Sequence, residues 1–284
     1  MTNYIVRRNN WGKPSCDYIT DTYPELVVIN KDKQEMPNDA EWVVRWATTN
    51  TLGPQETPPK VINSAQAIHK VFNKGQFRHL LSKKGLAPET WLSSYAWDMS
   101  GGRLPVIIRP LKHSASEDLH FCQNYYEVME TCQKFIDEDK DFYISEFIPK
   151  DHEYRVFIGS GRVLAVMEKI PNDPDAVSWG IDETWRYIDW SDWPQNVVST
   201  ACAAFSYSNL HIGAVDIMTF ADRAYCLEVN SGPLMSPYYG AQIAKAIKWI
   251  IDNDHRTILP VGTKQDGFMW KNYVHPALSK GAVL

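Results

Sequence analysis

Two apolar runs near the end of the chain, joined by the short polar turn 221–224, form its clearest hydrophobic pattern. This pattern predicts a hairpin of two strands. Because strand side chains alternate between faces, Glu228 and Asn230 are expected on the same face. A turn centred near Asp222 sets Asp216 within about one residue of the position opposite Glu228. Two carboxylates placed there repel each other unless a cation lies between them, so we predict a cation site. The alternative is the polar outer face of a half-buried hairpin.

The same periodicity predicts an alternation of strands and helices before and after this hairpin. Strand-like runs occupy 26–29, 42–46, 105–110, 142–148, 153–158 and 163–167. One helical pattern starts at Asn63 or Ser64, and further helical patterns cover 76–83, 125–136, 197–208 and 239–251. The segments 48–59, 111–118 and 171–195 have no clear period and are predicted to be loops.

Composition narrows the class of protein. A chain of 284 residues can bury a sizeable core and divides into two or three subdomains. The net charge of −5 gives no reason to expect broad binding to nucleic acid, although a local basic groove stays possible. No apolar run approaches the roughly 20 residues of a membrane span. Five scattered cysteines form no CxxC pair, which indicates reduced thiols and a cytoplasmic protein rather than disulfides or structural zinc.

Several charged residues stand at the ends of these elements in a characteristic order. Lys74 stands just before the predicted helix 76–83, which ends at Gly85, and Arg109 closes an apolar strand. Further along, the order continues with Ser145-Glu146-Phe147-Ile148, Glu153-Tyr154-Arg155, Asp216 and Glu228-Val229-Asn230. From about 63 to 237 this order resembles the ATP-grasp superfamily, especially carboxylate–amine ligases such as the ribosomal-protein glutamate ligases and D-alanine–D-alanine ligase.

The resemblance implies an α+β fold of the ATP-grasp type, in which two α+β subdomains clasp ATP. A small α/β N-terminal subdomain precedes them. The expected division is 1–62 for this leading unit, 63–145 for the central subdomain and 146–284 for the C-terminal subdomain, which carries the metal site.

The resemblance also implies residues that bind nucleotide and metal. Lys74 and Arg109 would hold the α- and β-phosphates of ATP. The backbone of Phe147 and Ile148 would pair with the adenine edge, and Glu146 and Glu153 would bond the adenine amino group or the ribose hydroxyls. The hard-oxygen set Asp216, Glu228 and Asn230 would hold one or two Mg²⁺ ions.

Arg155 and Lys169 are expected to face the acyl-phosphate oxygens as catalytic cations. His113, with Lys112 and Ser114, lies on the loop after Pro110 that would close over the γ-phosphate. Two departures from the superfamily stand out. Arg109 replaces the usual lysine, and the segment 112–118 lacks the glycines that let backbone N–H groups approach phosphate.

The implied function is an ATP- and Mg²⁺-dependent ligase that joins a carboxylate to an amine through an acyl phosphate and releases ADP and phosphate. The alternatives are a kinase that phosphorylates a small acceptor and a nucleotide-binding module without turnover. The substrates would be small molecules or peptides, and no membrane partner is expected. The tryptophans of 179–193 either shape the acceptor pocket or fill a core.

Overall fold

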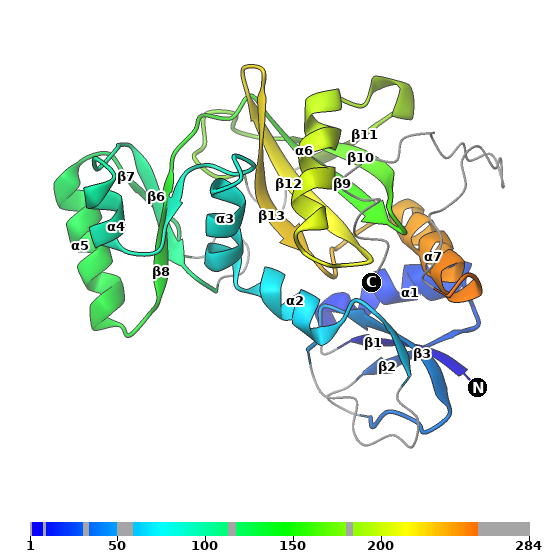
Figure 1. Ribbon diagram of the computed structural model, residues 1–284. Helices are drawn as coiled ribbons and strands as arrows, with labels where there is room; N and C mark the ends of the chain where they lie inside the picture. The colour runs from blue at the N-terminus through cyan, green and yellow to red at the C-terminus, as the bar shows by residue number, and fades with distance from the viewer. Residues whose placement is uncertain are drawn as a thin grey trace.

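The computed structural model of the protein describes residues 2–7, 10–30, 34–49, 59–112, 118–179 and 184–254. Figure 1 shows these residues arranged around three β-sheets, each built from a different part of the chain. The predicted loop 48–59 lies largely outside the described residues, and so does the end of the chain beyond 254.

The first sheet is parallel and has the strand order β2-β1-β3-β4. Its elements are β1 (Thr2–Arg7), the short helix η1 (Asn10–Gly12), α1 (Lys13–Thr22), β2 (Leu26–Asn30), β3 (Ala40–Trp46) and β4 (Lys60–Ile62). The predicted strands at 26–29 and 42–46 are confirmed as β2 and β3. Ile5 and Val44 are fully buried, because helices cover parallel sheets and their strands become continuously apolar.

The second sheet is antiparallel, with the order β5-β8-β6-β7. Its elements are β5 (Thr90–Trp91), α4 (Ser94–Met99), β6 (Val106–Pro110), β7 (His120–Cys122), α5 (Tyr125–Asp137) and β8 (Phe142–Glu146). The helix predicted over 125–136 is confirmed as α5, which packs Val128, Cys132 and Phe135 into the core of this sheet.

The third sheet is also antiparallel, in the order β11-β10-β9-β12-β13. Its strands are β9 (His152–Gly159), β10 (Arg162–Ile170), β11 (Thr184–Ile188), β12 (Ile212–Phe220) and β13 (Arg223–Asn230). Alternate residues of β9 enter two different cores: Val156 packs with helix α6 (Gln195–Ser206) and Phe157 with helix α7 (Pro237–Asp252). Helices therefore cover both faces of this sheet.

Two helices connect the leading sheet to the rest of the molecule (Figure 1). They are α2 (Ala65–Phe72), capped by the Ser64 hydroxyl that accepts from the Ala67 N–H, and α3 (Lys74–Ser82). Ile68 of α2 and Phe77 of α3 pack in the same core as the third sheet and α6. Elements from different parts of the chain thus share one core. The division of the chain into subdomains at 62/63 and 145/146 remains a prediction.

The segment 171–195 is not a loop throughout, which corrects the sequence prediction. It contains strand β11 and the short helix η2 (Trp190–Asp192). Strand β11 is the edge of its sheet, so the main-chain ladder with β10 holds it in place while much of its surface stays exposed. A strand stabilised in this way carries a weak hydrophobic pattern.

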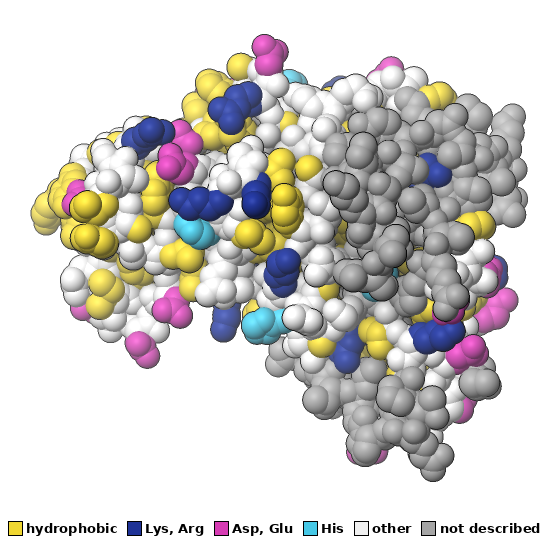
Figure 2. All heavy atoms as spheres, viewed as in Figure 1, with side chains coloured by type: hydrophobic (Ala, Val, Ile, Leu, Met, Phe, Trp, Pro, Cys, Tyr) yellow, Lys and Arg dark blue, Asp and Glu magenta, His cyan; other side chains and the backbone are white. Residues whose placement is uncertain are grey.

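Helices α4 and α5 also expose an apolar surface on the side away from the core. Tyr95, Met99 and Tyr126 are each more than two-thirds exposed, and apolar side chains gather at this end of the face in Figure 2. Within the described ranges, no helix combines the length and apolar character that crossing a membrane requires.

Gly75, the second residue of α3, allows this helix to lie close to the second sheet. A Cβ built there would lie 2.3 Å from Leu111 Cδ2 and 2.7 Å from Tyr143 Cδ1. The leucine methyl group can move, but the Tyr143 ring is only 1% exposed and packed in place. We therefore expect Gly75→Ala to lower the free energy of unfolding by about 1–3 kcal/mol, measured by urea denaturation, despite the better helix propensity of alanine.

Gln76→Ala is the matched control, because Gln76 is the next residue of the same helix and is exposed. This variant should stay within about 0.5 kcal/mol of the wild type. Equal stability of Gly75→Ala and Gln76→Ala would contradict the close approach of α3 to the sheet.

Candidate active site

The described residues surround a cavity of about 1460 Å³ that all three sheets help to line. The leading sheet contributes the ends of β1 and β3, the second sheet contributes β6 and β8, and the third contributes all five of its strands. Helix α3, residues 177–179 and residues of the segment 232–239 also line it. Most of the predicted site residues lie here: Lys74, Arg109, Glu146, Phe147, Ile148, Glu153, Arg155, Lys169, Asp216, Glu228 and Asn230.

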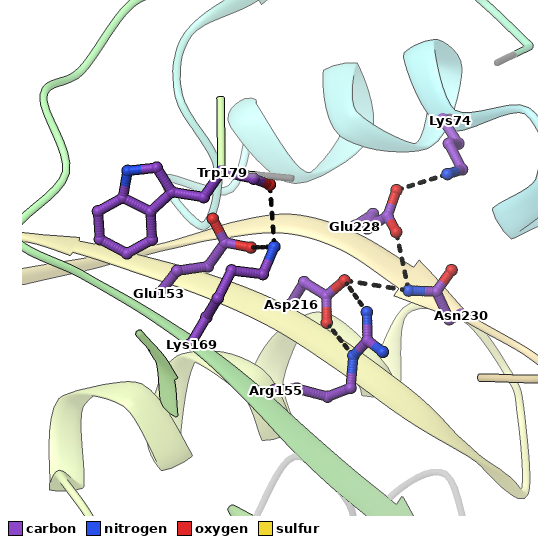
Figure 3. A network of polar contacts seen from close by, with 8 residues as sticks. All are labelled: Lys74, Glu153, Arg155, Lys169, Trp179, Asp216, Glu228 and Asn230. Carbon is purple, nitrogen blue, oxygen red and sulfur yellow. Dashed lines mark hydrogen bonds and ion pairs between the residues drawn. The ribbon is translucent and has the colours of Figure 1, made fainter. Parts of the chain in front are cut away.

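The β12–β13 hairpin has the predicted register. Asp216 is directly opposite Glu228, and a bulge follows between Asp216 and Ile217. The Asn230 amide lies on the same side and donates to Glu228 Oε1 at 2.9 Å and to Asp216 Oδ2 at 3.3 Å (Figure 3). The two carboxylates and the amide therefore form one cluster.

Two side-chain cations neutralise this cluster (Figure 3). Arg155 of β9, opposite Asp216 on the neighbouring strand, donates from Nε to Oδ1 at 2.7 Å and from its terminal NH2 group to Oδ2 at 2.8 Å. Lys74, the first residue of α3, places its Nζ 2.5 Å from Glu228 Oε2. Each carboxylate thus has a basic side chain beside it, and the metal site predicted at this cluster stays a prediction.

A second group of charges lies on β9 and β10. Glu153 accepts from Lys169 Nζ at 2.7 Å and from Lys150 Nζ at 3.0 Å, so one carboxylate holds two ammonium groups. The Trp185 ring lies 5.1 Å from Lys169 Nζ and 5.0 Å from Arg155 Cζ, within the range of cation–π contacts. These contacts hold the cations against the cavity wall.

The four tryptophans of 179–193 lie in different surroundings, and a role of any of them in an acceptor pocket stays a prediction. Trp179 and Trp185 line the cavity, and the Trp179 carbonyl accepts from Lys169 at 3.1 Å. Trp193 instead packs against the core under α6 and donates from Nε1 to the Ile188 carbonyl at 3.1 Å. Trp190 is not among the described residues that line the cavity.

Burial and charge shift the pKa values of the two central carboxylates in opposite directions. Burial raises the pKa of Glu228, but the Lys74 ammonium and the hydrogen bonds from Lys74 and Asn230 outweigh it, so the net pKa is well below its usual value. For Asp216, burial is the larger effect and raises the pKa against the opposing influence of Arg155. Glu228 is therefore the carboxylate that the site holds firmly ionised.

The lowered pKa of Glu228 predicts a pH-dependent contribution to stability. Because the folded-state pKa lies below the usual 4.5, ionised Glu228 stabilises the fold above about pH 4.5, and this contribution is lost as the pH falls. The difference in unfolding free energy between the wild type and Glu228→Gln should therefore shrink between pH 6 and pH 3, as measured by urea denaturation. A difference that stays constant over this range would contradict the assignment.

The predicted adenine residues lie where β8 leaves the second sheet. Glu146 Oε2 accepts from the Glu89 N–H at 3.4 Å, and the Phe147 N–H donates to the Pro105 carbonyl at 3.1 Å. That N–H thus serves the sheet rather than the cavity. Ile107, Phe147, Ile148, Met218 and Leu227 supply an apolar wall to this part of the cavity.

Of the three residues predicted on the loop after Pro110, the structure describes one. Lys112 is exposed and is not among the described residues that line the cavity. His113 and Ser114 lie outside the described residues.

Sequence reasoning missed several cavity residues. Arg78 lies one helical turn after Lys74, a spacing that could have revealed it. Arg7 ends strand β1 and Trp46 ends strand β3, and both residues line the cavity. These two parallel strands are neighbours in the order β2-β1-β3-β4, and the direction in which strands are added to the sheet reverses between them. Ligands of parallel sheets bind at such points, but strand β1 was not predicted.

The donor chemistry of the hairpin fits Mg²⁺, which the resemblance seen in the sequence implies. Asp216 and Glu228 offer carboxylate oxygens and Asn230 an amide oxygen, the hard donors that Mg²⁺ prefers. Each carboxylate has about four lone-pair sites, so an oxygen that accepts from Lys74 or Arg155 can still bind a metal. Within the described ranges no group of three or more His, Cys, Asp or Glu side chains is placed to hold a metal ion.

Comparisons with known proteins identify the fold. No protein-family model matches the sequence, and a comparison with curated proteins finds no match. Solved structures do match. A RimK domain ATP-grasp protein from Sphaerobacter thermophilus has a TM-score of 0.60 at 13% identity, over 86% of this chain and 99% of that one. The chain has the ATP-grasp fold.

Two further ATP-grasp structures extend over similar lengths. D-alanine–D-alanine ligase from Bacillus anthracis, complexed with ATP, has a TM-score of 0.62 at 12% identity and covers 89% of this chain and 99% of its own. The ATP-grasp ligase PsnB, complexed with a phosphomimetic variant of its minimal precursor, Mg and ADP, has a TM-score of 0.64 at 12% identity, with coverage of 87% and 98%. The α+β ATP-grasp fold predicted from the sequence is thus confirmed.

Proposed function

We propose that the protein is an ATP- and Mg²⁺-dependent ligase that joins a carboxylate to an amine through an acyl phosphate and releases ADP and phosphate. The observation that carries this proposal is that five polar residues meet at one cavity and that hydrogen bonds link them into one network. They are Lys74, Arg155, Asp216, Glu228 and Asn230. These residues come from α3, β9, β12 and β13.

The charge of the cavity supports a polyanionic ligand. Its lining carries seven Lys and Arg residues against four Asp and Glu residues, a net charge of +3 in a protein whose net charge is −5. A cavity with low-dielectric walls concentrates such a field. A nucleoside triphosphate, with its several phosphate charges, suits this field.

The residues fit the separate tasks of the proposed reaction. Lys74 and Arg109 would hold the phosphates, while Glu146, Glu153 and the backbone at Phe147 and Ile148 would bind adenine and ribose. Bound Mg²⁺, held by Asp216, Glu228 and Asn230, would neutralise charge on the transferring phosphoryl group. The structures of similar fold that hold ATP, or ADP with Mg, support this choice of cofactors.

Arg155 and Lys169 would stabilise the negative charge that develops when a carboxylate attacks the γ-phosphate. Both lie on the cavity wall, held by acidic partners and by the Trp185 ring. Charged donors preorganised in this way lower the barrier because they need no rearrangement during the reaction. The assignment of His113, Lys112 and Ser114 to the γ-phosphate stays part of the proposal.

The acceptor substrates would bind toward the leading sheet. There Arg7 and Trp46 lie at the strand ends, and Trp185, Tyr187 and Tyr238 face the same cavity. A guanidinium among aromatic rings suits a small-molecule or peptide carboxylate with an apolar neighbour.

The proposed reaction needs no cysteine nucleophile. All five thiols are buried, and burial raises the pKa of Cys16 and Cys202 to about 12. A cytoplasmic location is part of this proposal.

The test is turnover of ATP·Mg with libraries of carboxylates and amines, scored by ADP release and by product mass. A ligase yields an amide with equal amounts of ADP and phosphate, and hydroxylamine added in place of the amine should trap the acyl phosphate as a hydroxamate. ADP with a stable phosphorylated acceptor would show a kinase. Tight ATP binding with no ADP release in any mixture would leave a nucleotide-binding module.

A further inference from the structure

Arg78 lies on the cavity wall but forms no ion pair within the described part of the chain. It follows Lys74 by one turn of α3, so two cations project from the same side of the helix. The Arg78 Nε atom is buried and has no hydrogen-bond partner among the described residues. A buried donor without a partner is unfavourable, which makes this guanidinium a candidate for contact with a ligand.

The helix itself gives no stabilising reason for this arrangement. Like charges four residues apart repel each other, and cations near a helix N-terminus oppose the helix dipole. The first turn of α3 contains no acidic residue, and Glu228 of β13 pairs with Lys74 but not with Arg78. A bound anion would compensate the charge of Arg78.

The packing at Gly75 brings helix α3, which carries Arg78, close to Leu111, just past the end of strand β6, which carries Arg109. Without a side chain there, α3 approaches Tyr143 and Leu111, and the Gly75 N–H donates to the Leu111 carbonyl at 3.3 Å. Leu111 follows Arg109, which lies opposite Tyr143 in the sheet and also lines the cavity. Burial lowers the pKa of Arg109, and the Arg78 charge adds to this effect, as expected for two neighbouring guanidinium groups.

We propose that Arg78 is a further phosphate-binding residue, which forms with Arg109 a pair of guanidinium groups for the polyphosphate chain of a nucleotide. This inference rests on the proposed function, since it assumes that the cavity binds ATP. Guanidinium forks bind phosphate oxygens bidentately. Such a pair would compensate for the segment 112–118, which has no glycine and so differs from the backbone cradles that usually hold phosphate.

The test is calorimetric titration of the wild type, Arg78→Gln and Arg78→Lys with adenosine, ADP and a non-hydrolysable ATP analogue, each with Mg²⁺. Arg78→Gln should weaken binding of the ATP analogue by roughly 10- to 100-fold, the effect of one charge-assisted hydrogen bond. It should leave adenosine binding unchanged, and Arg78→Lys should recover part of the loss because it keeps the charge but not the fork. Arg103→Gln is the matched control, since Arg103 is exposed and lies outside the cavity lining.

Two results would overturn the role of Arg78 while leaving the proposed function standing. One is equal affinity of Arg78→Gln and wild type for the ATP analogue. The other is an equal loss for adenosine and for the analogue, which would assign Arg78 to the shape of the cavity. Failure of the wild type to bind any of the three ligands would overturn the proposed function itself, and this inference with it.

Discussion

Replacement of Glu228 by glutamine is expected to lower ATP-dependent turnover by roughly 10²–10³-fold, the usual cost of losing one electrostatic stabiliser of a transition state. Glu228 is ionised, contacts Lys74 and Asn230, and lies opposite Asp216. The amide keeps the shape of the side chain but removes the charge that would hold both Lys74 and Mg²⁺. Turnover should be measured as ADP release over a range of Mg²⁺ concentrations, where the variant should require more Mg²⁺ than the wild type.

The matched control is Glu130→Gln, which makes the same change on the exposed face of α5 away from the cavity. This variant should keep wild-type turnover. Unchanged turnover and Mg²⁺ dependence in Glu228→Gln would reject the metal site and the catalytic role of the hairpin.

Removal of the Asp216 side chain is expected to lower the free energy of unfolding by about 3–5 kcal/mol, the cost of leaving a buried charge without its partner. The Asp216 and Arg155 side chains are only 8% and 18% exposed. In Asp216→Ala the Arg155 guanidinium would lose both of its hydrogen bonds to that carboxylate. Urea denaturation of the wild type and the variant measures the difference.

A second replacement shows whether the unpaired charge is the cause. Asp216→Leu combined with Arg155→Met removes both charges and should be less destabilised than Asp216→Ala, because an apolar pair needs no compensating charge. Asp252→Ala breaks the exposed Lys248–Asp252 pair and should cost no more than about 0.5 kcal/mol. A double variant that is less stable than Asp216→Ala would show that Arg155 has a stabilising role of its own.

Much of the secondary structure could be predicted because it depends on local pattern. The β12–β13 hairpin, helix α5 and the Ser64 cap of α2 all follow from apolar spacing and short polar turns. Strand β11 could not be predicted in this way, because pairing with β10 stabilises it more than burial of its own side chains. From the sequence, Trp185 could therefore be named only as one of several tryptophans in a predicted loop.

The sequence by itself determined that Asp216, Glu228 and Asn230 lie together, since the turn length and the two-residue period of strands set their register. Only the tertiary structure decided which cations meet them. Arg155 is 61 residues from Asp216 and Lys74 is 154 residues from Glu228, distances over which no local pattern reports contact. The same holds for Arg78 and Arg109, because Gly75 of helix α3 packs against Tyr143 of strand β8, and Tyr143 is the sheet partner of Arg109 in β6. Local alternation thus sets which side chains share a face, and long-range packing sets which charges become partners.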